Sequence, residues 1–195
     1  MISRASSTNR FLRRRRRFRI AASALLPLQM LAVAARGETG GDQRSTIDAK
    51  AAVVYNFAKF VEWPGLAPDA PIIICVVGDD RFSTALTGVA RGPKIEGHAI
   101  EVHAIATPNG HACHMLFIST HAHDAAQALD MVKDGLTLTV GDAGRFAGGG
   151  GMIEILDDRD RMRFAINVNA VQRSQLKVSS RLLGLATIVR DEHAR

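Results

Sequence analysis

The apolar run PIIICVVG, residues 71–78, constrains the fold more than any other stretch of this chain. A strand with one solvent-facing side alternates apolar and polar residues, because only its inner face is buried. This run contains no charged or hydroxyl side chain and is rich in β-branched residues. The pattern predicts a strand buried on both faces, which is typical of a parallel sheet covered by helices on both sides.

Strands and helices alternate after this run. Hydrophobic periodicity predicts further strands at 98–106, 114–119 and 136–141 and helices at 79–90 and 121–135. Two apolar runs flank the polar turn DDRD at 157–160, which predicts a β-hairpin over 152–168. Residues 169–189 follow in register for one helix, on the positions Val171, Gln175, Val178 and Leu182, with a short terminal strand. We therefore expect one α/β domain at 46–190, with a mixed β-sheet flanked by helices and a C-terminal hairpin and helix.

A helix is also predicted at the start of this domain. Ser45 and Asp48 have the spacing of a capping box, after a polar segment at 36–45 that we expect to be flexible. The helix should end at Trp63, because a residue before proline is disfavoured in the helical region. Apolar side chains recur at three- and four-residue steps, at Ile47, Ala51, Val54, Ala58 and Val61. We assign the aromatic residues of this helix to core packing, with a ligand site as the alternative.

The first 35 residues have the features of a secretory signal peptide. Eight arginines and no acidic residue lie there, with the apolar stretch IAASALLPLQMLAVAA and an A-x-A sequence at 32–34. Without these 35 residues, 17 basic residues face 19 acidic ones, so the net charge changes from +6 to −2. The basic total therefore does not indicate nucleic-acid binding. We expect export from the cytoplasm, with an uncleaved membrane anchor as the alternative.

Export gives the two cysteines, Cys75 and Cys113, a particular meaning. In an oxidising compartment an even number of cysteines usually indicates a disulfide. Both cysteines lie in or beside apolar strand-like runs, which two neighbouring core strands would bring together. A bridge that closes this loop would stabilise the fold by about 4 kcal/mol if it acts on chain entropy. Two buried free thiols are the alternative.

Four consecutive glycines at 148–151 raise the question of a nucleotide site. A phosphate-binding P-loop needs a lysine and then a hydroxyl residue after its last glycine. Gly150 and Gly151 occupy those two positions here, and a strand rather than a helix follows. We therefore interpret the glycines as a turn that leads into the hairpin, and we expect no phosphate site.

A histidine cluster raises the question of a zinc enzyme. Its members His111, His114, His121 and His123 lie within 13 residues. The sequence has neither H-E-x-x-H nor C-x-x-C, and the ligands would straddle a predicted strand. It also lacks the G-x-S-x-G motif of a serine nucleophile. We expect a protein with no catalytic residues, metal or cofactor, and we retain a zinc-dependent enzyme as a rival.

Several stretches together resemble the YfiR family of periplasmic proteins. They occur in the family's order and extend over residues 46–190. They are AAVVYNFAKFVEWP (51–64), ICVVGDDRF (74–82), CHMLFIS (113–119), LTVGDAGRFAGGGGMIEI (138–155) and RMRFAINVNAVQRSQLKVSSRLLGLATIV (161–189). The most specific parts are the helix end with Tyr-Asn-Phe-x-Lys-Phe-x-x-Trp-Pro and the glycine segment that leads to Met-Ile.

The resemblance implies a regulator rather than an enzyme. Such a protein, often a homodimer, binds the periplasmic domain of a membrane-bound diguanylate cyclase and holds it inactive, so that relief of the inhibition raises cyclic-di-GMP. The resemblance also implies that Cys75 and Cys113 form a family disulfide. Some members carry a second cysteine pair near the glycine segment, and this chain lacks it. A redox switch based on that second pair is therefore in doubt.

A partner-binding protein needs only an apolar patch with a polar rim. Four residues near the glycines and the hairpin are candidates for this contact: Phe146, Met152, Arg161 and Arg163. Core packing and a solvated strand face are the alternatives for each of them. A different reading is a periplasmic small-ligand sensor that serves a histidine kinase or another membrane receptor, because α/β domains carry clefts at the ends of their strands.

Overall fold

The computed structural model describes residues 38–109, 112–133, 135–158 and 161–191 of the chain. The chain divides into two units, residues 1–36 and 37–195, and every described residue belongs to the second unit. The predicted signal peptide therefore lies outside the described residues, as does His111. Within the described ranges, no helix combines the length and the apolar character needed to cross a membrane.

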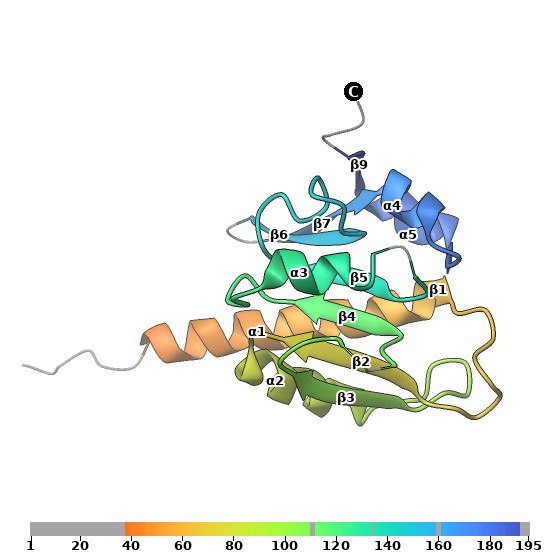
Figure 1. The fold of residues 1–195 in the computed structure, drawn as a ribbon. Helices are drawn as coiled ribbons and strands as arrows, with labels where there is room; N and C mark the ends of the chain where they lie inside the picture. Colours follow the sequence, from red (N-terminus) through yellow and green to blue (C-terminus); the bar gives the residue numbers. More distant parts are fainter. Residues whose placement is uncertain (1–37, 110–111, 134, 159–160, 192–195) are drawn as a thin grey trace, which may run out of the picture. The chain divides into compact units, whose positions relative to one another are not determined.

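The second unit is built on a seven-stranded mixed sheet (Figure 1), with the spatial order β3-β2-β4-β5-β6-β7-β9. Strands β2 to β6 pair in parallel, β7 runs antiparallel to β6, and β9 is parallel to β7. In chain order the strands are β2 (Ile72–Val77), β3 (Ile100–Ile105), β4 (Met115–Ile118), β5 (Leu138–Gly141), β6 (Ile153–Asp158), β7 (Arg161–Asn167) and β9 (Thr187–Val189). The predicted mixed α/β fold and its hairpin are confirmed.

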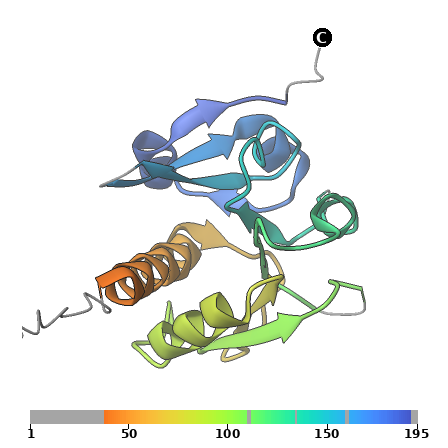
Figure 2. The same cartoon turned by 90° about the vertical axis from the view of Figure 1, so that its left-hand side faces the viewer.

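Helices cover both faces of this sheet. Figure 2 shows α1 and α2 on one side, in orange and yellow-green, and α3 on the other, in green. The helices are α1 (Glu38–Phe57), η1 (Ala58–Phe60, a 3-10 helix), α2 (Asp80–Ala90), α3 (Ala125–Asp130), α4 (Val168–Arg173) and α5 (Ser180–Leu185). A separate two-stranded sheet pairs β1 (Val61–Glu62) with β8 (Lys177–Val178).

The central strands β2 and β4 are buried on both faces, as the apolar runs predicted. In β2, Ile74 and Val76 pack in the cluster that includes α1 and α2, whereas Cys75 and Val77 pack with α3. Strand β4 alternates in the same way. Phe82 of α2 stacks on a β4 phenylalanine, Phe117, with ring centroids 4.0 Å apart. Complete burial of a side chain of this size contributes about 2–3 kcal/mol.

A disulfide joins Cys75 in β2 to Cys113, two residues before β4, with the two Cα atoms 5.7 Å apart. That separation is ordinary for a disulfide. The bond forms because β2 and β4 are neighbours in parallel register, with Ile74 opposite Met115. The expected bridge is therefore present in the structure, and the alternative of two free thiols is not.

The ends of the chain's helices differ from the sequence-based expectations. Helix α1 begins at Glu38, within the segment expected to be a flexible lead-in, and η1 ends at Phe60 rather than at Trp63. The single helix expected over 169–189 is wrong. The chain instead forms α4, β8, α5 and β9, because Val178 pairs across to Val61 of β1 as part of a strand. A terminal strand was expected and is present.

The glycine segment forms a turn between β5 and β6 that wraps around one aromatic ring. A Cβ added at Gly151 would lie 2.2 Å from Cε1 of Phe146, and one at Gly141 would lie 2.5 Å from Cδ2 of the same ring. Both distances are far shorter than a non-bonded carbon contact. The two glycines thus leave room for the buried Phe146 ring between them. Gly150, in the same turn, has φ of 105°, a backbone angle that favours glycine.

We predict that Gly151→Ala lowers the free energy of unfolding by about 1–3 kcal/mol, the usual cost of overpacking. The ring of Phe146 cannot move away toward Gly141, because that glycine is also in close contact with it. Chemical denaturation measures the loss. Gly144→Ala in the same turn is the control, since nothing lies within 4 Å of its added Cβ. Equal stability of the two variants would contradict this account.

Candidate functional site

The strand order places a crevice at the carboxyl ends of β2 and β4. Strand β3 pairs with one edge of β2, and β4, the next strand in the chain, pairs with the other edge. At such a reversal the loops that leave two neighbouring parallel strands diverge, and α/β proteins bind ligands in the opening. These loops begin here at Gly78 and Ser119.

An open cleft of about 780 Å³ occupies this position. One wall is the side of α1 that carries Thr46 and Lys50, and the other is formed by the loops after β2, β4 and β5. The loops contribute Asp80, Thr120 and Asp142 to the lining. The cleft therefore collects polar side chains from segments that are far apart in the sequence.

An ion pair lies at the base of this cleft. Lys50 Nζ is 2.6 Å from Asp142 Oδ2, and the two side chains are only 18% and 10% exposed. The second oxygen, Oδ1, accepts a hydrogen bond of 2.6 Å from the backbone N–H of Thr120. Partly buried charges must be paired and hydrogen-bonded to be tolerated, and both conditions are met. The carboxylate thus joins α1, the loop after β4 and the end of β5.

The loop after β2 is held close to the loop after β4. Gly78 has φ of 88°, and a Cβ there would lie 2.6 Å from the backbone of Ala122. A larger residue would therefore separate the two loops. The next residue, Asp79, is the N-cap of α2 and accepts a hydrogen bond of 2.9 Å from the N–H of Phe82. This cap agrees with the helix predicted at 79–90, of which Asp79 is the N-cap.

Two backbone N–H groups of the glycine turn point at a carboxylate of the protein itself, as they would at a bound anion. Glu154 of β6 accepts hydrogen bonds from the backbone N–H groups of Arg145, at 2.9 Å, and Ala147, at 3.0 Å. The carboxylate is buried, and each of its oxygens takes one of these bonds. These two N–H groups are therefore committed to Glu154. This arrangement supports the interpretation of the glycines as a structural turn.

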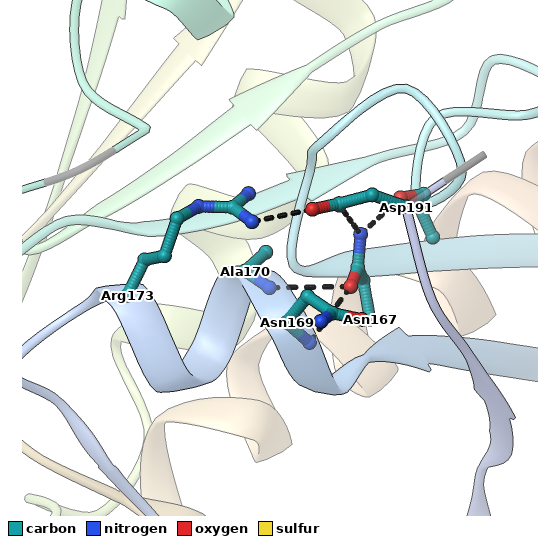
Figure 3. Close-up of polar contacts among 6 residues, drawn as sticks. Asn167, Asn169, Ala170, Arg173 and Asp191 are labelled. Carbon is teal, nitrogen blue, oxygen red and sulfur yellow. Dashed lines mark hydrogen bonds and ion pairs between the residues drawn. The ribbon is translucent and has the colours of Figure 1, made fainter. Parts of the chain in front are cut away.

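A second polar network links this turn to the end of the described chain (Figure 3). Asn167 is fully buried and donates from Nδ2 to the carbonyl of Ala147 and to Oδ1 of Asp191, each at 2.6 Å. Its Oδ1 caps α4 by accepting from the N–H of Asn169 and Ala170. Asp191 also pairs with Arg173 on α4. The network holds the chain after β9 against α4.

The structure separates the four candidate partner-binding residues into two classes. Phe146 and Met152 are 8% and 0% exposed and pack in the two core clusters. Their side chains offer almost no surface to a partner in this structure, because Phe146 lies between two glycines and Met152 lies in the larger core cluster. Arg161 and Arg163 lie on β7, two residues apart, and both are exposed. They remain candidates for a partner contact.

The histidines of the predicted cluster that the structure describes are dispersed. His121 and His123 are exposed on the loop before α3, whereas His114 is half-buried at the start of β4. Among the described residues, no group of three His, Cys, Asp or Glu side chains is placed to hold a metal ion. Nothing in the described residues therefore favours the zinc-dependent enzyme kept as a rival.

His114 has a structural role beside the disulfide. Its Nδ1 accepts a hydrogen bond of 3.0 Å from the N–H of Ile73, and its carbonyl accepts one of 2.8 Å from Nε1 of Trp63. An imidazole nitrogen that accepts a hydrogen bond carries no proton. Burial, together with the nearby charge of His98, lowers the pKa of His114 below its ordinary value of 6.5. The fold therefore favours the neutral ring.

Sequence reasoning did not find the Lys50–Asp142 pair. Each residue carried only a weak signal. Lys50 lies three residues after the apolar position Ile47, and Asp142 is the first residue after an apolar strand. Only the strand order and the path of α1 show that these positions meet. The sequence did predict a cleft at strand ends, as a general property of α/β domains.

We predict that Asp142→Asn lowers the free energy of unfolding by about 2 kcal/mol, because Lys50 is left partly buried without a counter-charge. A double-mutant cycle with Lys50→Met, followed by denaturation, isolates the pair. The matched control is the pair of Lys133 with Asp130 at the C-terminal end of α3, 2.8 Å apart but with side chains 39% and 67% exposed. That pair should contribute about 0.5 kcal/mol or less. Equal coupling energies for both pairs would contradict the assigned burial.

We predict that part of the pH dependence of stability comes from His114. A group whose folded pKa is lowered binds fewer protons in the folded state, so stability falls as pH drops below 6.5 toward the lowered pKa. His114→Gln should flatten the curve of unfolding free energy against pH in that range. Well above that range the His114→Gln curve should run parallel to the wild-type curve, because the ring is neutral there in both the folded and the unfolded state. If the His114→Gln curve also runs parallel to the wild-type curve below pH 6.5, the assignment is refuted.

Comparison with known proteins identifies a family for this chain. No curated protein is similar enough to this chain to match it. The family described as YfiR/HmsC-like matches residues 47–187, which includes α1 from Ile47, the whole cleft wall formed by the strand-end loops, both cysteines and the glycine turn. Because the match covers well over half of the chain, this protein belongs to the YfiR/HmsC-like family.

Proposed function

We propose that this protein is an exported regulatory binding protein that inhibits the periplasmic domain of an inner-membrane diguanylate cyclase and so controls cyclic-di-GMP signalling. The match to the YfiR/HmsC-like family over residues 47–187 is the observation that carries the proposal. Membership of this family supports a periplasmic regulator rather than a catalyst, and a membrane diguanylate cyclase as its partner. The disulfide between Cys75 and Cys113 is consistent with an oxidising compartment.

Regulation by such a protein follows from differential binding. A repressor shifts its target only if it binds the inactive state more tightly than the active one. The contact surface on this chain is proposed to include Arg161 and Arg163, whose side chains lie on one face of β7. Exposed arginines are frequent anchors in protein interfaces, because a guanidinium can form several directed hydrogen bonds. A homodimer of the regulator is part of the proposal.

A small-ligand sensor that serves a histidine kinase or another membrane receptor is the second candidate. The cleft at the carboxyl ends of β2 and β4 favours it, because that place in an α/β sheet is a usual ligand site. The two functions differ in the membrane protein that binds the regulator. Capture from membranes therefore distinguishes them.

We predict that the immobilised protein captures a diguanylate cyclase from detergent-solubilised inner membranes of its own cell. Arg161→Ala combined with Arg163→Ala should weaken this capture by about tenfold, the usual effect of losing a main interface arginine. Arg91→Ala, at the end of α2, removes an exposed arginine elsewhere and should have no effect. Capture of a histidine kinase instead would favour the sensor, and failure to capture any cyclase would overturn the proposal.

The same capture with reduced protein tests the disulfide. If Cys75–Cys113 only stabilises the fold, protein that remains folded after reduction should capture the cyclase as well as the oxidised protein does. Capture by the oxidised form alone, with both forms folded by circular dichroism, would show that binding depends on the bond.

A further inference from the structure

Strand β3 is an open edge of the seven-stranded sheet, and it is the lowest strand in Figure 1. It pairs with β2 along its whole length, and within the described part of the chain no strand pairs with its other edge. Native sheets often protect such an edge with a lysine, a proline, a bulge or a very short strand. Strand β3 has none of these, since its six residues IEVHAI keep an unbroken register with β2. The opposite edge strand, β9, has only three residues.

The backbone groups on the open edge follow from the pairing with β2. The N–H of Ile72 donates to the carbonyl of Ala99 at 2.8 Å, so Ala99 directs its carbonyl toward β2. Successive residues of a strand direct their backbone groups to alternate edges. Ile100, Val102 and Ala104 therefore direct their N–H and C=O groups away from β2. These are the groups that an added strand would bind.

The two faces of β3 differ in chemistry. Ile100 and Val102 pack against the core cluster that includes α1 and α2, and Ala104 lies on the same face. Glu101 and His103 lie on the other face, with Glu101 Oε2 3.6 Å from His103 Nε2 and side chains 53% and 46% exposed. The open edge thus has an apolar face and a face with one acidic and one basic side chain, two residues apart.

A second copy of β3, antiparallel about a twofold axis at Val102, matches both the backbone and the side chains. Val102 then lies opposite Val102 of the second copy, and Ile100 lies opposite Ala104. The outward N–H and C=O groups bond to one another, and apolar side chains meet on one face. On the other face, Glu101 of each copy lies directly opposite His103 of the other. An imidazole can bind a carboxylate as a cation or as a neutral donor.

The neighbouring registers lack this match. An axis at Glu101 would place two carboxylates directly opposite each other, which is unfavourable. An axis at His103 would oppose two imidazoles and would leave Glu101 opposite the apolar Ile105. Charge complementarity therefore selects the axis at Val102.

Helix α2 also leaves room for a second copy. Figure 2 shows α1 on the side of α2 that faces the rest of the sheet, and Arg81 and Ala85 line a hollow together with α1. At 3.6 residues per turn, the flank of α2 opposite α1 carries Ser83, Thr87 and Ala90. All three side chains are small, and the distance at which two helices pack depends on the side chains between them. Two copies of α2 can therefore lie side by side above the joined strands.

We propose that two copies of this protein join through the open edges of their β3 strands, antiparallel about Val102, so that the two sheets become one continuous sheet. This pairing gives an interface to the homodimer that is part of the proposed function, and it rests on that part alone. The proposed contact with a cyclase involves β7, which lies elsewhere in the sheet.

Engineered cysteines in protein exported from the full-length reading frame test the pairing. Opposite residues that exchange both backbone hydrogen bonds have Cα atoms about 5.5 Å apart, which a disulfide can bridge. Val102→Cys should therefore give a covalent dimer on a non-reducing gel after mild oxidation. His103→Cys is the matched control, because its two copies lie on a diagonal about 8 Å apart. The native bridge should not exchange with the new thiol, since Cys75 and Cys113 are buried.

Sedimentation velocity tests the same pairing without a covalent bond. The wild type should be a dimer at micromolar concentration. Ala104→Pro removes an outward N–H but is tolerable on an edge strand, and it should raise the dimer dissociation constant by about tenfold or more. Glu101→Lys should also weaken the dimer, because it places a lysine opposite His103. Glu62→Lys, an exposed position on β1, is the control and should have no effect.

The possible failures are distinguishable. A monomeric wild type would overturn this proposal and the homodimer, and would leave the cyclase contact to the capture experiment. A dimer that withstands both Ala104→Pro and Glu101→Lys, or cross-linking of His103→Cys in place of Val102→Cys, would overturn the β3 pairing alone. Circular dichroism confirms that each variant is folded. Because the two measurements use different variants, misfolding of one variant leaves the other measurement to decide.

Discussion

Strand β2 is the element on which the rest of this structure depends. It is hydrogen-bonded to β3 on one edge and to β4 on the other, and its side chains contribute to the cores on both faces of the sheet. A strand in that position cannot carry a charged side chain without burying it, so its sequence is continuously apolar. The two-sided burial also requires helices on both faces, which α2 and α3 supply after β2 and β4. The disulfide and the cleft follow from the same placement, since Cys113 lies just before β4 and the cleft lies at the end of β4.

Several polar groups of the interior join segments of the chain that are far apart in the sequence. Asp142 connects α1 to two strand ends, Glu154 holds the glycine turn, and Asn167 ties that turn to the chain after β9. Each of these side chains has hydrogen-bond partners, which offsets the cost of removing it from water. Asp80 and Asp124 differ in this respect, because both are exposed at the hollows on the carboxyl side of the sheet.

The proposed contact with a membrane cyclase and the cleft lie on different parts of this unit. The contact is proposed for the exposed arginines of β7, whereas the cleft lies at the carboxyl ends of β2 and β4. Coupling between the two would require an element that both can shift, because a ligand changes an equilibrium only through a difference in affinity. Helix α1 borders the cleft through Lys50 and also contacts β7, through the edge-to-face contact of Phe57 with Phe164.

The sequence by itself determined the class of fold. Continuous apolar runs identified the buried strands, the turn at 157–160 identified the hairpin, and an even number of cysteines identified the disulfide. These signals are local, or need only one assumption about the compartment. The division of the C-terminal segment into α4, β8 and α5 was not predictable, because Val178 fits a helical pattern until β1 is available to pair with it. The core positions of Phe146 and Met152 and the meeting of Lys50 with Asp142 were likewise decided by tertiary structure. Apolar residues have the same composition in a core and in an interface, and only the path of the chain shows which of the two they occupy.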